Sequence, residues 1–517
     1  MTIQEQWADL HKREKSARHA EQWGTARQLQ KQILELKPKL QAAQSKPASV
    51  PVHKPENVPS SVPSSTRHLT FDQWKVVTSP AGRALLDRVT KIVLEHEAPT
   101  HQRQEREQDA ANYRKLIHAV VANLIYQDLI HRDTTLPYRM GLRVSRNEKA
   151  LRSKDTFRYN ASFMSKRLTR LLDTLAATDL IVQDVPFKQT SVRSITKQGK
   201  ILCNETVIYP SGRFIAFLHE CKVCDSWADV GRYESAEDRE EIVVQTSLAI
   251  HEEDAASRLH YEDTASHIQY RKWTRKFNEF LESVQMACCE PLKPSTTTGI
   301  RLDLRNRHMK RIFNRGRLDS LGRYYGSTWW LPLSKQERFE RIRLAGEPVA
   351  ELDFSSMLVR LAYGLVGAVP PAGDQYTLEG FERSRDAWKI VFCARLFQRQ
   401  GNKQKDKRKR LPQDALPLFH PDELRGKEPQ DIWDALSLKH PALKPLFGTD
   451  VGHSLFFKES QIISEVMAQM VKHSIPFLPV HDAVYVPVSQ SEKGKRIMEG
   501  LFKGMVGIEG LVRVTRA

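Results

Sequence analysis

The chain has 517 residues, with 80 Lys and Arg against 62 Asp and Glu, and its formal net charge is +18. This length predicts two or three domains, and the charge favours a polyanionic partner, nucleic acid before an acidic membrane surface. A membrane partner is not expected, because no apolar stretch approaches the roughly 20 residues that span a bilayer. A secreted, disulfide-stabilised fold is not expected either. The segment "MTIQEQWADLHKREK" lacks the apolar centre of a signal peptide, and six cysteines are scattered along the chain.

The first 66 residues are predicted to form an arm and a linker. Within residues 1–44, Leu29, Ile33, Leu36 and Leu40 follow the 4-3-4 spacing of a short coiled coil. Residues 45–66, "SKPASVPVHKPENVPSSVPSST", hold five prolines and no periodicity. This composition is typical of a linker.

Residues 67–235 are predicted to be mainly helical and to bind DNA. Amphipathic helices are expected at 113–130 and 161–183, the second with basic residues on one side and leucines on the other. The strand-like run 200–210, the turn "SGR" and "FIAFL" (214–218) would follow as a basic hairpin. Helices followed by such a hairpin suit a winged helix with 161–176 as recognition helix. A helical domain with solvated charges is the alternative.

One metal-like spacing occurs in this region. The run is His219-Glu-Cys221-Lys-Val-Cys224, with Cys203 upstream. A structural zinc site needs four ligands, usually from two such pairs, and only one CxxC exists here. Ordinary reduced cysteines are the favoured interpretation, and zinc binding at 221–224 stays open.

Residues 236–345 are predicted to be a helical, thumb-like region that contacts a nucleic-acid template. Its segment 305–330, "RNRHMKRIFNRGRLDSLGRYYGSTWW", interleaves Arg and Lys with aromatic residues and Gly. Positive charge neutralises phosphates and aromatic faces stack on bases. A solvated charged face is the alternative.

Two aspartates occupy special positions in residues 346–517. "PVAELDF" reads as a strand followed by a helix that Ser355 or Ser356 caps, so Asp353 stands at a strand end. In "PFLPVHDAVYVPV", His481 and Asp482 lie where two short strands would turn. In an antiparallel sheet these two positions can be neighbours.

Two carboxylates at one sheet edge raise each other's pKa unless a cation lies between them. Mg²⁺, for which Mn²⁺ can substitute, is the natural occupant, and two such ions about 4 Å apart support phosphoryl transfer. An Asp at a turn is by itself most often a turn-former. The pair, in a basic chain, favours a metal site that meets its substrate.

These residues carry a resemblance to a known family. "ELDFSSMLVR" resembles motif A (D-Y-S-x-x-E-x-R) and "VHDAVYV" resembles motif C (V-H-D-E) of family A DNA polymerases and single-subunit phage-type RNA polymerases, and the two aspartates are 129 positions apart. "RDAWKIVFCARLF" (385–397) is similar to the family's fingers helix, and "NRGRLDSLGRYYG" to its T-G-R-L-S-S segment. The order also resembles phage- and plasmid-type proteins that join a helix-turn-helix front to a compact palm.

The resemblance implies an α+β fold, with a palm of antiparallel sheet and helical fingers in 346–517. It implies that Asp353 and Asp482 hold two Mg²⁺ ions and that Lys389 binds the nucleotide's triphosphate and protonates the leaving pyrophosphate. It further implies a nucleotide site of Arg385, Lys389, Phe397 and Leu358. The primer-template contacts it implies are His481, Arg360, Arg323, Tyr325 and Arg317.

Two candidate residues keep an alternative. Arg360 can equally be a structural arginine of the palm. Glu459 is either a metal or substrate contact or an acid at the start of a helix, where the helix dipole favours it. Ser355 is a secondary candidate that follows from its place in motif A.

The function predicted on this basis is a template-directed DNA polymerase that copies a mobile element or replicon, with DNA primer-template and nucleoside triphosphates as partners in the cytoplasm. The sequence departs from the family at Leu358, where DNA polymerases have glutamate, and at Ala483, the last position of motif C. These departures leave two alternatives: a non-catalytic replication initiator with a degenerate palm, and an RNA polymerase or primase of the same superfamily.

Overall fold

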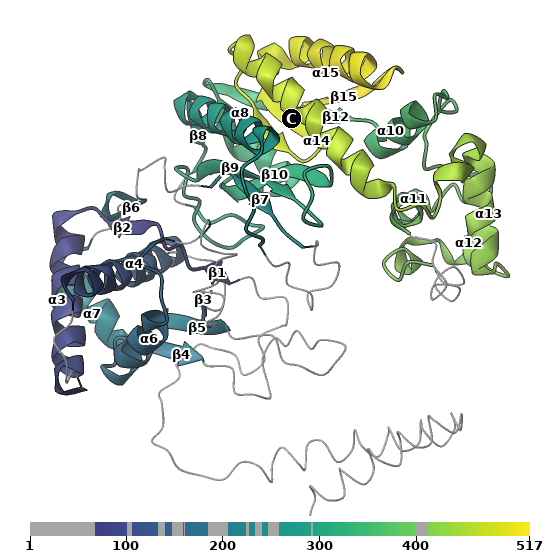
Figure 1. Cartoon of the computed structure of the whole chain (residues 1–517). Coiled ribbons are helices and arrows are strands. Elements are labelled where there is room, and N and C mark those ends of the chain that lie inside the picture. Colours follow the sequence, from purple (N-terminus) through teal and green to yellow (C-terminus); the bar gives the residue numbers. More distant parts are fainter. Residues whose placement is uncertain are drawn as a thin grey trace, which may run out of the picture. The chain divides into compact units, whose positions relative to one another are not determined.

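The structure is a computed structural model of the chain (Figure 1). It describes residues 68–100, 106–132, 140–146, 159, 161–184, 205–223, 227–232, 240–246, 258–290, 293–398 and 411–516. The chain divides into the units Met1–Val62 and Pro63–Ala517, and the described residues belong to the second. The predicted arm (1–44) and linker (45–66) therefore lie outside the described residues, as do Cys203 and Cys224.

The first part of the described chain, up to residue 232, combines helices with two small sheets. Aliphatic side chains of α4 form the centre of its hydrophobic core. One sheet has the strand order β1-β3-β5-β4, and β2 pairs with β6 in the other. The helices are α3 (Pro80–Glu97), α4 (Glu107–His131), α6 (Arg167–Ala177) and α7 (Gly212–Glu220), with the 3₁₀ turns Ala98–Thr100 and Trp227–Asp229. The strands are β1 (Leu69–Thr70), β2 (Lys75–Val77), β3 (Leu142–Ser145), β4 (Ile181–Asp184), β5 (Glu205–Pro210) and β6 (Val230–Arg232).

Helix α4 agrees with the helix predicted at 113–130, but two other predicted elements are wrong. The helix predicted at 161–183 ends at Ala177, and the following residues turn at Asp179, with φ +55°, into strand β4. The segment 214–218 is not a strand but part of helix α7. The Ser211 hydroxyl accepts a hydrogen bond from the Phe214 N–H (3.1 Å) and so caps this helix. The hairpin of this region is therefore β4–β5.

Residues 236–345 were predicted to be helical, and the structure corrects this. Helices α8 (Ala265–Ser283) and α9 (Lys335–Arg341) are present, but strands dominate the segment predicted to contact template. The inward side chains of β9 alternate with half-buried ones, which is the period of a strand rather than of a helix. The strands are β7 (Ile242–Val244), β8 (Met286–Cys288), β9 (Arg307–Phe313), β10 (Leu321–Thr328) and β11 (Ile342–Leu344). β9 pairs antiparallel with β10 and parallel with β7.

The two tryptophans of this segment are core residues, not stacking platforms for bases. Trp329 and Trp330 are 3% and 0% exposed. The Trp330 indole N–H donates a hydrogen bond to the Pro479 carbonyl (3.1 Å). The end of β10 is thereby tied to the strand that precedes His481.

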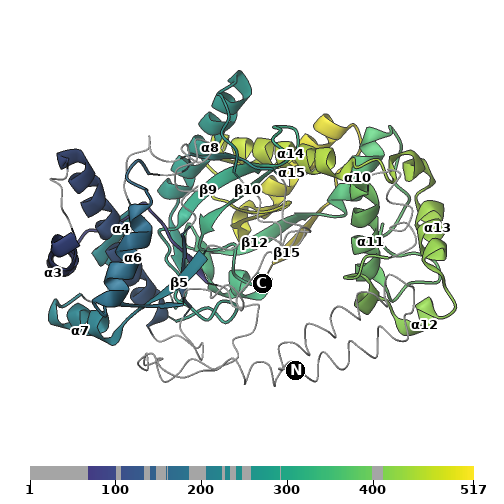
Figure 2. The same cartoon turned by 60° about the horizontal axis from the view of Figure 1, so that its bottom comes forward.

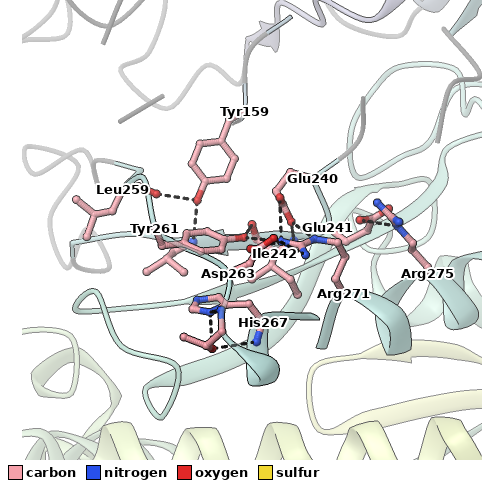
Figure 3. A network of polar contacts seen from close by, with 12 residues as sticks. Tyr159, Glu240, Glu241, Ile242, Leu259, Tyr261, Asp263, His267, Arg271 and Arg275 are labelled. Carbon is pink, nitrogen blue, oxygen red and sulfur yellow. Dashed lines mark hydrogen bonds and ion pairs between the residues drawn. The ribbon is translucent and has the colours of Figure 1, made fainter. Parts of the chain in front are cut away.

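A polar network holds the segment around β7 against α8 (Figure 3). Arg271 of α8 forms ion pairs with Glu240 (3.0 Å) and Asp263 (2.8 Å). The Tyr159 hydroxyl donates to the Leu259 carbonyl (3.0 Å) and accepts from the N–H of β7 residue 244 (3.2 Å). These bonds satisfy polar groups that flank a short strand, which has few pairing partners of its own.

The C-terminal part of the chain is built on an antiparallel sheet. Its strand order is β13-β14-β12-β11-β8, and β15 pairs with β12 as well. The strands new here are β12 (Glu347–Phe354), β13 (Leu478–Val480), β14 (Ala483–Pro487) and β15 (Val512–Arg516). The helices are α10 (Met357–Leu365), α11 (Arg385–Phe397), α12 (Pro421–Leu424), α13 (Pro429–Lys439), α14 (Gly452–Lys472) and α15 (Ser491–Val506), with the 3₁₀ segments Leu416–Leu418, Pro441–Leu446 and Val488–Gln490.

Helix α15 packs on β12 and β15, and α14 lies beside α15 (Figures 1 and 2). Gly494 permits the close approach of α15, because a Cβ at this position would lie 2.5 Å from the Leu352 side chain. The large core of this part combines side chains of β12, β14, α10, α11, α14 and α15. Mixed helices and mainly antiparallel sheets agree with the predicted α+β class, although the β1–β3 and β7–β9 pairs are parallel.

Candidate active site

Strand β12 presents the carboxylates of Glu351 and Asp353 on the face opposite to α15. Phe354 lies against Phe502 of α15, with ring centroids 5.4 Å apart, and Leu352 lies next to Gly494 of the same helix. Because side chains alternate along a strand, Glu351 and Asp353 point to the other face of the sheet. Asp353 is half-buried there, one residue before the strand ends.

Asp482 comes to Asp353 through a two-residue hairpin turn. Val480 pairs with Ala483, so His481 and Asp482 form the turn that was predicted. Strand β14 then pairs with β12 in a register that sets Ala483 opposite Asp353. His481 has φ +58°, a left-handed conformation that costs a non-glycine residue about 1–2 kcal/mol. Asp482 therefore directly precedes the residue that pairs with Asp353.

The electrostatics show that the two aspartates lie close enough to interact. Burial, followed by the charges of Asp482 and Glu351, raises the pKa of Asp353 to about 6. Lys335 and Lys389 oppose this rise in pKa, and both therefore also lie near Asp353. Like charges brought together in this way favour the binding of a cation.

A buried ion pair lies near Asp482. Arg323 of β10 binds Glu459 of α14 through two hydrogen bonds of 2.7 and 2.9 Å. Glu459 is 2% exposed, and burial raises its pKa to about 7, with a further rise from Asp482. Burial opposes the charge on Arg323, but Glu459 outweighs it and raises the pKa of the arginine.

This pair changes the interpretation of both residues. Glu459 is the eighth residue of α14, which begins at Gly452, so the explanation by the helix dipole is wrong. Its carboxylate neutralises Arg323 and is not a free ligand for a metal ion. Arg323 in turn is committed to Glu459 and also lies over the Phe456 ring (4.0 Å). The pair can position the site, while the contact of Arg323 with template stays a prediction.

Helix α11 presents Lys389 to the site and uses its other predicted residues elsewhere. Lys389 is exposed and interacts electrostatically with Asp353. Arg385 forms two hydrogen bonds to Asp374, of 3.0 and 2.9 Å. A nucleotide would have to compete with this carboxylate for Arg385.

The other end of α11 packs against α14. The Phe397 ring lies 4.8 Å from the His453 ring and 4.9 Å from the Phe456 ring. The same ring would meet a Cβ at Gly452 at 2.7 Å, so it closes the contact between the two helices. Phe397 has a packing role in the structure, and its contact with nucleotide stays a prediction.

The turn after Asp353 is held by Arg360, which is buried. Its guanidinium donates to the carbonyls of Ser355 (3.1 Å) and Glu509 (3.2 Å). Ser356 occupies the position before α10 with φ +57° and makes no capping bond through its side chain, so the predicted serine cap is not formed. Leu358, in the first turn of α10, is 6% exposed within the core. Arg360 therefore makes the contacts of a structural arginine, and its contact with primer-template stays a prediction.

Tyr325 lies beside the hairpin turn, and Arg317 lies in the turn between β9 and β10. The Tyr325 ring is 5.7 Å from the His481 ring, so β10 and the hairpin turn offer a joint aromatic surface. His481 is exposed and available to a ligand. Arg317, also exposed, forms an ion pair with Asp319 in the turn between β9 and β10. Solvent screens such an exposed pair, and a phosphate can replace its carboxylate.

Sequence reasoning missed a second polar group beside Asp353. Glu351 is buried and binds Lys335 of α9 and the hydroxyl of Tyr485, the latter at 2.5 Å. Arg338 of α9 donates to the same hydroxyl (3.3 Å). The alternation in "ELDF" was the available signal for Glu351, because it places residues 351 and 353 on one face. Nothing local in the sequence links α9 to them.

The donor set suits Mg²⁺ better than a softer metal. Within the described parts of the chain, no group of three or more His, Cys, Asp or Glu side chains is arranged to hold a metal ion. Zinc sites need three or four protein ligands, whereas Mg²⁺ is commonly held by one or two carboxylates together with substrate phosphates and water. The adjacent, mutually repelling carboxylates of Asp353 and Asp482 fit the second arrangement.

Comparison with known proteins gives little further guidance. No protein-family model and no curated protein matches the chain. Among solved structures, the chain is similar to the POL domain of Pol1 from M. smegmatis, which was solved in complex with DNA primer-template and dNTP. The sequence identity is 11% and the TM-score is 0.26, and the match covers 86% of this chain and 67% of that chain. In the described residues no helix is long and apolar enough to cross a membrane.

Proposed function

We propose that the chain is a template-directed nucleotidyltransferase, a DNA polymerase that serves a mobile element or replicon and uses two Mg²⁺ ions. One observation carries the proposal: the register of β12 and β14 sets Asp353 opposite the residue that follows Asp482. Two aspartates far apart in sequence thus come to one edge of an antiparallel sheet, and Lys335 and Lys389 lie near Asp353. Phosphoryl transfer is the chemistry that such a site serves best.

The chain's own residues would act as follows. Asp353 and Asp482 would hold Mg²⁺, which when bound neutralises phosphate charge and makes a primer 3′-hydroxyl a better nucleophile. Lys389, exposed on α11, would bind the triphosphate and donate a proton to the leaving pyrophosphate. His481 and Tyr325 would orient the primer end through their adjacent rings. Leu358 would favour deoxynucleotides, because it offers a ribose hydroxyl no hydrogen bond.

The front region would bind duplex DNA. Its strands β3, β5 and β4 form an antiparallel sheet next to α4 and α6, which supports the winged-helix interpretation. Arg170 of α6 pairs with Glu97 (3.4 Å), and Arg167 lies over the Tyr113 ring (3.7 Å). The cations of the predicted recognition helix are therefore partly engaged within the protein, and exposed Lys166 is the better candidate for phosphate contact.

Primer extension tests the proposal. The full-length protein is incubated with primed DNA, Mg²⁺ or Mn²⁺, and either dNTPs or rNTPs. Incorporation of dNTPs that is lost in Asp353→Asn and Asp482→Asn, but retained in the exposed control Asp319→Asn, is the expected result. Incorporation of rNTPs would identify an RNA polymerase or primase instead.

The strongest competing function is a non-catalytic replication initiator, which Ala483 and Leu358 favour through their departure from the family pattern. Under this alternative, DNA binding would survive in both aspartate variants and no template, metal or nucleotide would support incorporation. Full activity of Asp353→Asn would also refute the polymerase proposal.

A further inference from the structure

The C-terminal strand brings an arginine to the side of Asp353. Strand β15 pairs antiparallel with β12, and in this register Arg513 lies directly opposite Asp353. Side chains of directly opposed residues point to the same face, with Cβ atoms about 5 Å apart. Asp353 thus lies between Ala483 of β14 on one side and Arg513 of β15 on the other.

The face on which Arg513 lies follows from the packing of α15. Val512 pairs with Phe354 and Val514 with Leu352, and these two β12 residues contact α15. Because side chains alternate along β15, Arg513 projects to the opposite face, together with Asp353. The side chain of Arg513 is exposed.

Several bonds hold β15 in this register. The Ser355 N–H, just after β12, donates to the Leu511 carbonyl (2.8 Å), and Arg360 donates to the Glu509 carbonyl (3.2 Å). The Val512 N–H donates to the Glu499 carboxylate of α15 (3.1 Å). The segment that leads into β15 is therefore anchored both to the turn after Asp353 and to the helix behind the sheet.

Arg513 differs from the other arginine of its strand. Arg516 pairs with Glu492 (2.7 Å) and donates to Ser491 (3.0 Å), both in α15. In the described chain, no ion pair or hydrogen bond of the Arg513 guanidinium is present, although Asp353 is its cross-strand neighbour. The strand register thus holds the backbone of Arg513 beside a candidate metal site, and its exposed guanidinium has the fork geometry that suits a phosphate group.

We propose that Arg513 binds a phosphate group of the substrate beside the carboxylate pair. This inference rests on the proposed function and deepens it. The phosphate belongs either to the backbone of the primer-template or to the triphosphate of the incoming nucleotide, because both bring the same chemistry to this face. In either case the C-terminal strand supplies a substrate contact that neither motif A nor motif C contains.

Two binding assays on the full-length protein test the inference and distinguish the two sources. The variants are Arg513→Ala, Arg513→Lys and the matched control Arg516→Ala, which lies on the same strand but faces the helices. Fluorescence anisotropy with a labelled DNA primer-template in Mg²⁺ is measured over a series of salt concentrations. Displacement of a fluorescent dATP analogue measures nucleotide binding.

If Arg513 binds a backbone phosphate, Arg513→Ala will reduce the slope of log K against log salt by about 0.9. If it binds the triphosphate, the affinity for the analogue will fall about tenfold, as expected for loss of one charge-assisted contact. Arg513→Lys will retain part of either effect, and Arg516→Ala will show neither. Thermal unfolding of the variants checks that they fold.

The inference is overturned if Arg513→Ala matches Arg516→Ala in both assays, or if the wild-type protein binds neither probe. Neither assay requires incorporation. A protein that binds both probes and responds to Arg513→Ala, but never extends a primer, would therefore retain this inference and lose the polymerase proposal.

Discussion

Replacing Asp353 with asparagine should make the protein more stable, because the carboxylate is held where its charge is unfavourable. Burial and the charges of Asp482 and Glu351 raise its pKa from 3.8 to about 6. Since one pKa unit corresponds to about 1.4 kcal/mol, the ionised carboxylate costs up to about 3 kcal/mol of folding free energy. Asparagine keeps the shape of the side chain and removes the charge.

The sign of the pH dependence follows from the direction of the shift. Between pH 4 and 6 the folded state binds more protons than the unfolded state, so wild-type stability falls as the pH rises through this range. The advantage of Asp353→Asn should therefore be up to about 3 kcal/mol at pH 8 and about 1 kcal/mol at pH 4.5. Below pH 4 it should disappear.

Urea unfolding at low ionic strength, in EDTA, measures this difference without screening the charges. Because the slope m increases with protein size, a gain of about 3 kcal/mol corresponds to a rise of the midpoint by about 1 M or less. The control is Asp319→Asn, an exposed carboxylate whose pKa Arg317 lowers, and it should show no gain at either pH. An Asp353→Asn protein no more stable than wild type at pH 8, or equally stabilised at both pH values, would refute the reasoning.

Four further results are expected. Glu459→Gln should lower the free energy of unfolding by about 3–5 kcal/mol, because it leaves Arg323 buried without its carboxylate. The double change Glu459→Leu with Arg323→Met should restore most of this free energy, as measured by urea unfolding. Trp330→Ala should lower the unfolding free energy by about 3–5 kcal/mol, whereas a surface aromatic used for stacking would cost little. Lys389→Ala should raise the nucleotide KM about tenfold in steady-state kinetics and leave primer-template affinity unchanged, since one charge-assisted contact is lost. Mg²⁺ should raise the urea midpoint of the wild-type protein, and it should raise the midpoint of Asp482→Asn much less. EDTA should abolish incorporation. Equal midpoint shifts in the two proteins would show that Asp482 does not hold the metal ion.

The local shape of the site could be predicted because few residues decide it. "PFLPVHDAVYVPV" contains two apolar runs separated by two polar residues, and the hairpin forms at these positions with Asp482 in the turn. "PVAELDF" ends where the strand ends, and the helix α10 follows after two serines. Both elements depend on neighbours within about ten residues, which the sequence displays directly.

Errors arose where distant parts of the chain override local preference. "FIAFL" has the composition of a strand, yet Ser211 caps it as a helix whose apolar face the core accepts. The segment around Trp329 and Trp330 has the composition of a nucleic-acid surface, yet both rings are buried. Its Arg323 is paired with Glu459, which lies 136 positions later in the chain.

The sequence by itself therefore determined the basic character of the chain and the two turns that carry Asp353 and Asp482, because alternation, turn chemistry and charge are local properties. Only the tertiary structure decided that these aspartates meet, that Glu459 neutralises Arg323, and that the C-terminal strand sets Arg513 beside Asp353. Each of these is a pairing between segments far apart in the chain. Such a pairing is selected by the packing of the whole core, because no short segment contains both partners.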